Sequence, residues 1–290
     1  MIQSFQVGNV RVGGTEAAPF FIAGPCVIES EAHALRMARL LTEIFGRVGI
    51  PFIFKASYDK ANRSSIRSFR GPGLVEGTRI LKTVRDTFGV PILTDVHAVH
   101  EVETAAEAAD VLQVPAFLCR QTDLVVEAGR SGRVVNVKKG QFLAPWDMGN
   151  VVEKIRSTGN DRIILTERGH TLGYNNLVVD FRAFAILRET GCPVVFDATH
   201  AVQIPGGLGD ASGGDARFIE PLARGAAAFG VDGLFFEVHD DPARALCDGP
   251  NALHSDRFEA LVRRILAVAK ATNGEEGIQN SEFRIQNGEG

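Results

Sequence analysis

Four side chains of the types that bind transition metals follow apolar segments that are far apart in the sequence. They are Cys26, His200, Glu237 and Asp248. Thiolate, imidazole and carboxylate together suit one divalent ion such as Zn, Fe(II), Mn or Co. The alternative is structural, since a single cysteine is often a small buried hydrophobe and a histidine can be a hydrogen-bonded core residue. A carboxylate directly after the apolar run GLFF is costly to bury alone, so Glu237 favours the metal site. Cys247 is interpreted as a bystander beside Asp248.

A second group of residues could bind phosphate. The segment 55–73, KASYDKANRSSIRSFRGPG, contains one acid and the cations Lys55, Lys60, Arg63, Arg67 and Arg70. Ammonium and guanidinium groups hold phosphate oxygens by charge-assisted hydrogen bonds, and a local cluster attracts anions even in a negatively charged protein. A solvated surface loop is the alternative interpretation. Lys138 and Arg168, at the ends of two further apolar runs, favour the phosphate site.

Eight short apolar runs precede these residues and explain how they could come together. The runs end at or near Cys26, Lys55, Asp95, Gln113, Lys138, Arg168, His200 and Glu237. Reactive groups gather at the C-terminal ends of the parallel strands in an α/β protein of the (β/α)8 TIM barrel class, because there the side chains leave the packed interior. A doubly wound open sheet is the alternative, but no G-x-G-x-x-G follows the first run. We therefore predict a barrel with its active face at these strand ends.

Helices are expected between the runs, with boundaries good to a few residues. Their ranges are 30–48, 74–88, 99–108, 120–130, 148–158, 177–190, 216–229 and 252–271. Gly-x-Pro at 49–51, 89–91 and 191–193 is typical of a helix end before a strand. A hairpin over 4–12 is expected to cover the bottom of the barrel. The predicted catalytic domain spans 1–271, and the polar segment 272–290 is predicted to be disordered.

Composition excludes several classes of function. The chain has 290 residues and a net charge of -4, so no general positive field would hold nucleic acid or an anionic membrane. The N-terminus lacks the features of a signal peptide, and no apolar run approaches the roughly 18 residues of a membrane span. Four cysteines without a C-x-x-C pair fit a reducing compartment. We expect a cytoplasmic enzyme that binds neither nucleic acid nor membranes.

Motifs spread over about residues 4–270 match one family. They are AGPCVIES, FKASYDKANRSSIRSFRGPGL, ILTDVH, LQVPAFLCRQTDL, NVKKGQFLAP, GYNNLVVD, FDATHAVQ, FFEVHDDP and LCDGP. With these motifs the chain resembles the 3-deoxy-D-manno-octulosonate 8-phosphate synthases. The resemblance implies a transferase that condenses phosphoenolpyruvate with D-arabinose 5-phosphate and water, releasing phosphate, in lipopolysaccharide biosynthesis. It also implies a homotetramer.

The resemblance further implies roles for individual residues. The metal-dependent branch of the family has cysteine where the other branch has asparagine, and Cys26 stands at that position. One divalent ion per subunit would then be held by Cys26, His200, Glu237 and Asp248. The residues implied to bind the two substrates are Lys55, Lys60, Asn62, Arg63, Ser64, Asp95, Gln113, Ala116, Arg120, Lys138 and Arg168. Those implied to be catalytic are Cys26, His200, Lys60, Asn62 and Asp95.

The implied substrate contacts divide between the two ligands. Phosphoenolpyruvate would be held by Lys55, Lys60, Lys138 and Arg168, with Gln113 and the backbone at Ala116 lining its pocket. The sugar phosphate would bind Asn62, Arg63 and Ser64, with Asp95 at a sugar hydroxyl and Arg120 reaching in from a neighbouring subunit. The glycine-rich segment 206–215 is predicted to be a lid, with a plain flexible linker as the alternative.

Two alternative functions remain. The first is an aldoheptonate synthase that uses erythrose 4-phosphate, but those related enzymes have Lys-Pro-Arg where this chain has the sequence from Lys60 to Arg63, KANR. That difference favours the five-carbon sugar. The second is a catalytically silent barrel that binds anions or metal, which the presence of all four metal-type residues and the cations disfavours.

Overall fold

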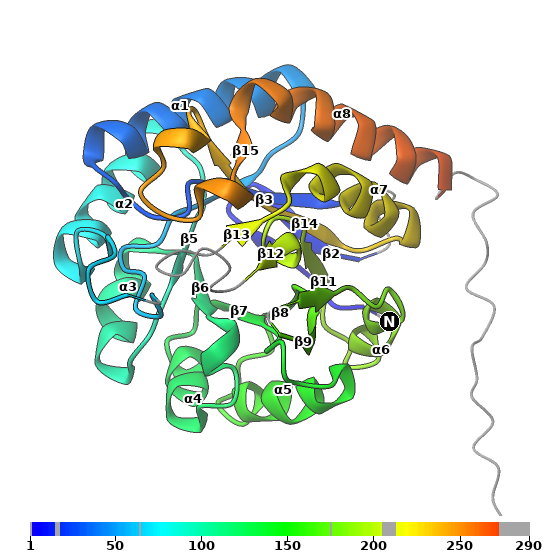
Figure 1. The fold of residues 1–290 in the computed structure, drawn as a ribbon. Helices are drawn as coiled ribbons and strands as arrows, with labels where there is room; N and C mark the ends of the chain where they lie inside the picture. The colour runs from blue at the N-terminus through cyan, green and yellow to red at the C-terminus, as the bar shows by residue number, and fades with distance from the viewer. Residues whose placement is uncertain (1, 15–17, 64, 175, 205–212, 273–290) are drawn as a thin grey trace, which may run out of the picture.

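Eight parallel strands form a closed barrel surrounded by helices in the computed structural model, which describes residues 2–14, 18–63, 65–174, 176–204 and 213–272 (Figure 1). The barrel strands are β3 (Phe20–Gly24), β4 (Ile53–Lys55), β5 (Ile92–Asp95), β6 (Val111–Val114), β7 (Val134–Lys138), β8 (Ile163–Glu167), β11 (Val194–Asp197) and β14 (Gly233–His239). Each pairs in parallel with the next, and β14 closes the ring by pairing with both β3 and β11. The predicted (β/α)8 fold is confirmed.

The helices of the described chain lie outside the strands, as Figure 1 shows. They are α1 (Glu31–Val48), α2 (Leu74–Phe88), α3 (Val102–Ala108), α4 (Thr122–Arg130), α5 (Met148–Arg156), α6 (Arg182–Arg188), α7 (Ile219–Phe229) and α8 (Ser255–Thr272). Ser30 caps α1 by accepting a hydrogen bond from the backbone N–H of His33 at 3.1 Å. Gly49 and Gly89 end α1 and α2 in the left-handed conformation, at φ 84° and 64°.

The helix predicted over 177–190 is wrong at its N-terminal end. Residues 177 and 178 belong to β10 (Asn176–Val178), which pairs with β9 (His170–Gly173) in an antiparallel hairpin. Helix α6 begins only at Arg182, after the Asp180 side chain has accepted a hydrogen bond from the Arg182 N–H at 3.0 Å. The apolar run LVV at 177–179 fits a helix turn by its pattern, but its first two residues belong to the hairpin strand β10. At 252–271 the difference is small, because β15 (Leu253–His254) pairs with β14 before α8 starts.

Several short elements decorate the loops. Two two-residue strands, β12 (Gln203–Ile204) and β13 (Gly213–Gly214), pair with each other. The 3-10 turns are η1 (Val99–Glu101), η2 (Ala116–Leu118), η3 (Pro145–Asp147), η4 (His200–Val202), η5 (Ala216–Phe218), η6 (Pro242–Arg244) and η7 (Gly249–Asn251). Most of the predicted lid, 206–212, lies outside the described residues, as does the predicted disordered tail except for Thr272, which ends α8.

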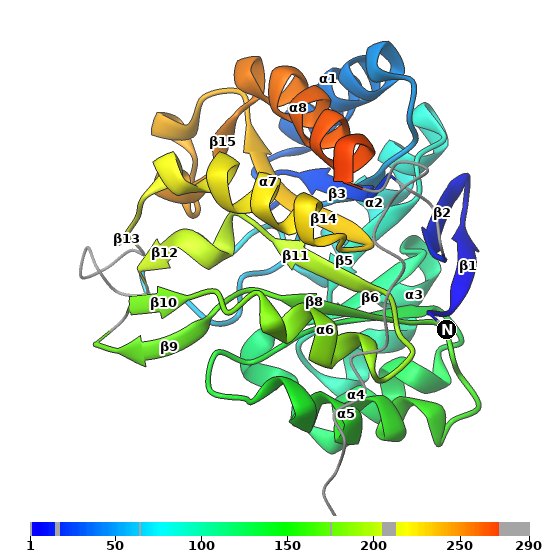
Figure 2. The ribbon, with the colours of Figure 1, turned by 90° about the vertical axis from the view of Figure 1, so that its right-hand side faces the viewer.

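The predicted N-terminal hairpin is confirmed and covers one end of the barrel. It consists of β1 (Ser4–Val7) and β2 (Val10–Gly13), and Figure 2 places it at the opposite end from β9, β10, β12 and β13. Its inward side chains Val7, Val10 and Val12 pack in one buried cluster with the barrel residues Phe20, Ile22, Ile53, Leu93, Val111, Val134, Ile164, Val195 and Phe235. A larger apolar core fills the space between the strands and the helices. Each Å² of apolar surface that these residues remove from water stabilises the folded state by about 25 cal/mol.

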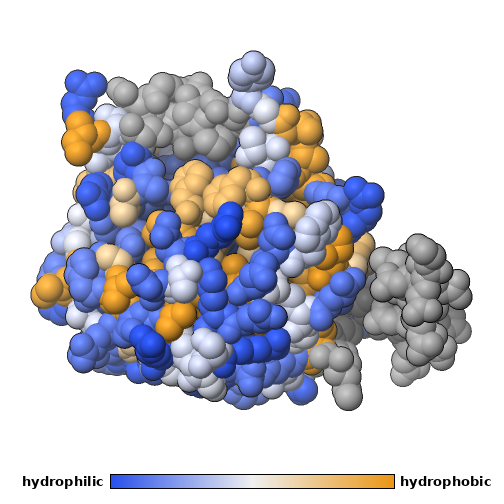
Figure 3. Space-filling model, turned by 90° about the horizontal axis from the view of Figure 1, so that it is seen from below, coloured by the Kyte–Doolittle hydropathy of each residue, from blue (hydrophilic) through white to orange (hydrophobic). Residues whose placement is uncertain are grey.

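The surface also carries large hydrophobic side chains. Those of Phe117, Phe142, Trp146, Leu172 and Tyr174 are more than half exposed. Figure 3, seen from the side of α4 and α5, shows hydrophobic side chains gathered among hydrophilic ones. None of the helices in the described ranges has both the length and the apolar character needed to cross a membrane.

Candidate active site and metal centre

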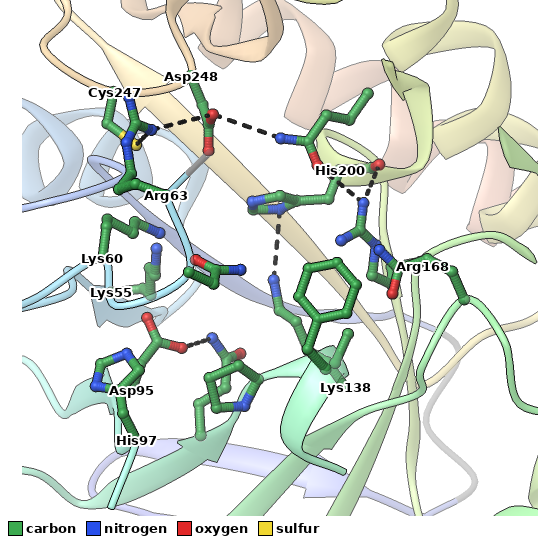
Figure 4. A pocket seen from close by; sticks show the side chains of 17 residues that line it. Lys55, Lys60, Arg63, Asp95, His97, Lys138, Arg168, His200, Cys247 and Asp248 are labelled. Carbon is green, nitrogen blue, oxygen red and sulfur yellow. Dashed lines mark hydrogen bonds and ion pairs between the residues drawn. The ribbon is translucent and has the colours of Figure 1, made fainter. Parts of the chain in front are cut away.

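A cavity of about 300 Å³ opens at the end of the barrel opposite the hairpin (Figure 4). Its walls come from the C-terminal ends of the barrel strands and from the loops that follow them. They are Lys55, Lys60, Asn62, Arg63, Asp95, His97, Gln113, Pro115, Ala116, Phe117, Lys138, Gln141, Arg168, His200, Gln203, Cys247 and Asp248. The cavity is of a size that suits small molecules, and its five lysine and arginine side chains suit anionic ones.

Two of the four predicted metal ligands, His200 and Asp248, line this cavity, and the other two, Cys26 and Glu237, are buried next to them. His200 Nε2 is 3.5 Å from Glu237 Oε1, and Cys26 Sγ is 3.4 Å from Asp248 Oδ2. Asp248 belongs to two triads whose donor atoms lie within 4.8 Å of one another: His200, Glu237 and Asp248, and Cys26, Cys247 and Asp248. The second oxygen of Glu237, Oε2, is buried and has no hydrogen-bond partner within the described part of the chain. An orphaned carboxylate oxygen beside imidazole, thiol and a second carboxylate fits a divalent cation.

His200 and two lysines lower the pKa of the buried Glu237. Lys55 Nζ donates a hydrogen bond to Glu237 Oε1 at 2.8 Å, and Lys60 Nζ lies 3.6 Å from the same oxygen. Burial by itself would raise the pKa of Glu237, but His200 and the two lysines hold it well below its ordinary value. Burial would lower the pKa of Lys60, yet Cys26 and Glu237 raise it well above the usual value. A buried carboxylate and two ammonium groups therefore face each other directly behind the cavity wall.

Asp197 orients His200 and Lys138. Its Oδ2 lies 2.5 Å from Lys138 Nζ and 2.8 Å from His200 Nδ1, and its Oδ1 accepts the backbone N–H of His200 at 2.9 Å. Burial would raise the pKa of Asp197, but His200 and Lys138 hold it well below its ordinary value. Because Asp197 occupies Nδ1, the other ring nitrogen, Nε2, faces Glu237 and is free to bind a metal.

A chain of hydrogen bonds fixes Asp95 across the floor of the cavity. Its carboxylate accepts hydrogen bonds from Ser57 Oγ and from Gln113 Nε2, the latter at 2.5 Å. Gln113 Oε1 in turn accepts from Asn136 Nδ2 at 2.8 Å, and Asn136 Oδ1 accepts from Thr166 Oγ1 at 2.7 Å. Burial alone would raise the pKa of Asp95, but Lys55 and Lys60 hold it below its ordinary value. Asp95 is thus a rigid anion with fixed neighbours.

Arg168 is held from two sides. Its Nη2 donates to the His200 carbonyl oxygen at 2.9 Å and to Gln203 Oε1 at 3.0 Å. On the preceding residue, Glu167 Oε1 accepts the Gly169 N–H at 2.6 Å, and Oε2 lies 3.4 Å from Lys139 Nζ. Burial raises the pKa of Glu167. The two hydrogen bonds from Nη2 restrict the guanidinium of Arg168, which suits a side chain that must meet an anion in one position.

Comparison with known proteins assigns the family. The sequence matches the DAHP synthetase I family over residues 4–272. The chain belongs to this family. A protein of Geotalea daltonii named "2-dehydro-3-deoxyphosphooctonate aldolase" is 60% identical over 92% of this chain and 98% of its own length. Proteins of the same name are 58% identical in Syntrophotalea carbinolica, over 94% of this chain and 99% of their length, and 59% identical in Geobacter sulfurreducens, over 92% and 98%. That name is a synonym of the octulosonate phosphate synthases, so the resemblance seen in the sequence motifs is confirmed.

In this member of the DAHP synthetase I family, most of the predicted substrate residues reach the cavity. Asn62, Arg63, Gln113 and Ala116 line it together with the lysines and Arg168. Ser64 lies outside the described residues. Arg120 is exposed and does not line the cavity; its carbonyl oxygen accepts a hydrogen bond from Lys154. The Arg70 side chain, 54% exposed, forms an ion pair with Asp59, so this cation of the 55–73 segment is not part of the cavity wall.

Sequence reasoning missed four residues of the site. Asp197 ends β11, His97 follows β5 by two residues, and Gln203 begins the short strand β12. Asp197 stands three residues before His200 in the run VVFDATH. That spacing was a usable signal. Cys247 is interpreted from the sequence as a bystander, but the structure places its Sγ 3.0 Å from Cys26 Sγ and its side chain at the cavity wall. It belongs to a loop, whose path no sequence periodicity predicts.

Proposed function

We propose that this protein is a 3-deoxy-D-manno-octulosonate 8-phosphate synthase. It condenses phosphoenolpyruvate with D-arabinose 5-phosphate and water and releases inorganic phosphate, in the supply of a lipopolysaccharide sugar. The observation that carries the proposal is one cavity in which five cationic side chains converge beside a metal-type set of donors. Relatives at about 60% identity carry the name of this activity over nearly their whole length.

The five cations of the cavity can be assigned to the two phosphorylated substrates by their positions. Lys138 and Arg168 come from neighbouring strands β7 and β8, and with Lys55 and Lys60 they bind the phosphate and carboxylate of phosphoenolpyruvate. Arg63 and Asn62 lie on the loop after β4 and bind the sugar phosphate. An anion clamped at two ends leaves its C3 carbon facing the aldehyde of the sugar, and this positioning accounts for a large part of the rate.

The metal in this proposal is one divalent transition ion, Zn, Fe(II), Mn or Co, held by Cys26, His200, Glu237 and Asp248. The buried orphan oxygen of Glu237 supports it. A bound ion of this kind polarises a carbonyl oxygen or lowers the pKa of a water molecule. We expect a chelator to abolish activity and one of these ions to restore it. Full turnover after complete metal removal would contradict the metal-dependent branch.

The proposed reaction has three steps, and residues of this chain assist them. The enol C3 attacks the aldehyde carbon, water adds at C2, and the resulting hemiketal phosphate loses phosphate by cleavage of its C–O bond. Lys138 and Arg168 neutralise the charge that the departing phosphate carries. Asp95, ionised and fixed by Ser57 and Gln113, accepts a hydrogen bond from a sugar hydroxyl. Asp197 keeps His200 in one orientation through the reaction.

The choice of sugar is the sharpest test of the proposal. Asn62 lines the cavity at the position where the aldoheptonate synthases differ, and it gives the sugar phosphate a hydrogen-bonding partner. We expect product from arabinose 5-phosphate and little from erythrose 4-phosphate when each is supplied with phosphoenolpyruvate. A preference for the four-carbon sugar would make the protein an aldoheptonate synthase. Loss of both activities in metal-replete protein would favour a silent barrel.

We also propose a homotetramer in the cytoplasm. The exposed side chains of Phe117, Phe142, Trp146, Leu172 and Tyr174 are of the kind that subunit interfaces cover. Arg120, exposed in one subunit, would then complete the site of a neighbour. Four cysteines without a disulfide suit a reducing compartment. Light scattering that gives the mass of a single chain would contradict the tetramer.

A further inference from the structure

The cavity contains a second thiol beside the four proposed metal ligands. Cys247 Sγ lies 3.0 Å from Cys26 Sγ, and both side chains are buried. Cys26, Cys247 and Asp248 place their donor atoms within 4.8 Å of one another, as closely as His200, Glu237 and Asp248 do. Asp248 is common to both triads. The donors therefore form one continuous group that includes two sulfur atoms.

Two consecutive residues, Cys247 and Asp248, both place a donor atom close to the Cys26 sulfur. Adjacent side chains of an extended chain point in opposite directions, yet Cys247 Sγ and Asp248 Oδ2 lie 3.0 and 3.4 Å from the Cys26 sulfur. Asp248 has φ 49° and ψ 29°, the left-handed conformation that residues other than glycine rarely adopt. The neighbouring loop is tied down by the Leu246 N–H, which donates to Glu29 Oε1 at 2.8 Å. A left-handed residue at a cavity wall points to a functional constraint on this loop.

A guanidinium group lies against the second sulfur and the neighbouring carboxylate. Arg63 Nη1 lies 2.8 Å from Cys247 Sγ and 3.7 Å from Asp248 Oδ1, as Figure 4 shows for these side chains. Lys60 lies on the other side of the group, near Glu237. Two sulfurs bound to one zinc ion at about 2.3 Å each, with an angle of about 109° between the two bonds, lie roughly 3.7 Å apart. A small separation of the two thiols is therefore enough to admit an ion between them.

We propose that Cys247 is an additional ligand of the metal ion, so that the site binds thiophilic divalent ions such as Zn and Cd through two thiolates. Each thiol releases its proton to solvent as its sulfur–metal bond forms. This inference rests on the metal site of the proposed function and extends it by one residue. It makes soft ions bind more tightly than the single-sulfur set would allow.

Cadmium titration of the reduced, metal-free protein counts the thiolates. The ultraviolet sulfur-to-cadmium charge-transfer band of the wild type should be about twice as strong, per bound ion, as that of Cys247→Ser or of Cys26→Ser. Cys192→Ser is the matched control, because it removes another buried thiol that does not line the cavity, and its band should equal that of the wild type. An unchanged band in Cys247→Ser would overturn the inference.

A second measurement needs no variant. X-ray absorption of the zinc-loaded wild-type protein should give two sulfur neighbours at about 2.3 Å. A single sulfur neighbour would overturn the role of Cys247 and leave the four-ligand site standing. Failure of the wild type to bind either ion would overturn both the inference and the metal-dependent function.

Discussion

The two ends of the barrel are built from the same strands and have opposite character. Along β7 the inward side chains are Val134, Asn136 and Lys138, and along β8 they continue from Ile164 through Thr166 to Arg168 just past the strand end. Each strand thus passes from an apolar layer under the hairpin, through a hydrogen-bonded polar layer, to a charged layer at the cavity. The apolar and hydrogen-bonded layers stabilise the fold, and the charged layer is placed to bind anions. This division is general for (β/α)8 barrels.

The largest expected effect is the loss of rate that follows a substitution in the charged layer at the cavity. Lys138→Ala should lower the rate of phosphate release by about 100- to 1000-fold, because it removes a fixed positive charge from the phosphate site. The protein should still fold, since its apolar layers are unchanged. Steady-state kinetics with a melting curve checks both statements. Lys82→Ala, which removes an exposed lysine on α2, is the control and should leave the rate unchanged.

A substitution in the apolar layer under the hairpin should lower the stability of the protein and leave its turnover number unchanged. Leu93→Ala, two residues before Asp95 on β5, should reduce the free energy of unfolding by about 2–5 kcal/mol because it leaves a cavity in the buried cluster. The folded fraction should keep a normal turnover number. Urea denaturation measures the loss. Val75→Ala, on α2 and 79% exposed, is the control and should leave the stability unchanged. The distinction between the two ends fails if Leu93→Ala stays as stable as the wild type or loses turnover while folded.

A substitution in the hairpin should lower the free energy of unfolding less than one in the barrel interior. Val12→Ala removes two buried methyl groups from the cover of the barrel and should cost about 2 kcal/mol of unfolding free energy. Val178→Ala, on the partly exposed β10, is the matched control and should cost much less. Denaturation of both variants decides the point. Equal losses would mean that the hairpin is not part of the core.

The smallest expected effect is a change in acid stability. Lys55 and Lys60 hold the pKa of the buried Asp95 below its unfolded value of about 3.9, so its contribution is present above that pH and is lost as the pH falls. In Asp95→Asn, the unfolding free energy should therefore fall less steeply between about pH 5 and about pH 2. Urea denaturation across this range measures the slope. A slope equal to that of the wild type would mean that Asp95 is not held ionised.

How much the sequence predicts differs between strands and loops. The strand-end residues Lys55, Asp95, Lys138 and Arg168 could be predicted, because an apolar run before each one defines both the strand and the end at which its side chain emerges. The hairpin β9–β10 could not, since its apolar residues also fit a helix turn. The approach of Cys247 to Cys26 could not be predicted either, because Cys247 lies in a loop, and no period of apolar residues defines the path of a loop.

One measurement tests the account most directly: phosphate release from phosphoenolpyruvate by the metal-replete protein, with and without arabinose 5-phosphate. We predict release that depends on the sugar phosphate and is matched by formation of the eight-carbon product. Release that is independent of the sugar, or no release with the folded, metal-loaded protein, would contradict the assignment of the charged end of the barrel to this condensation.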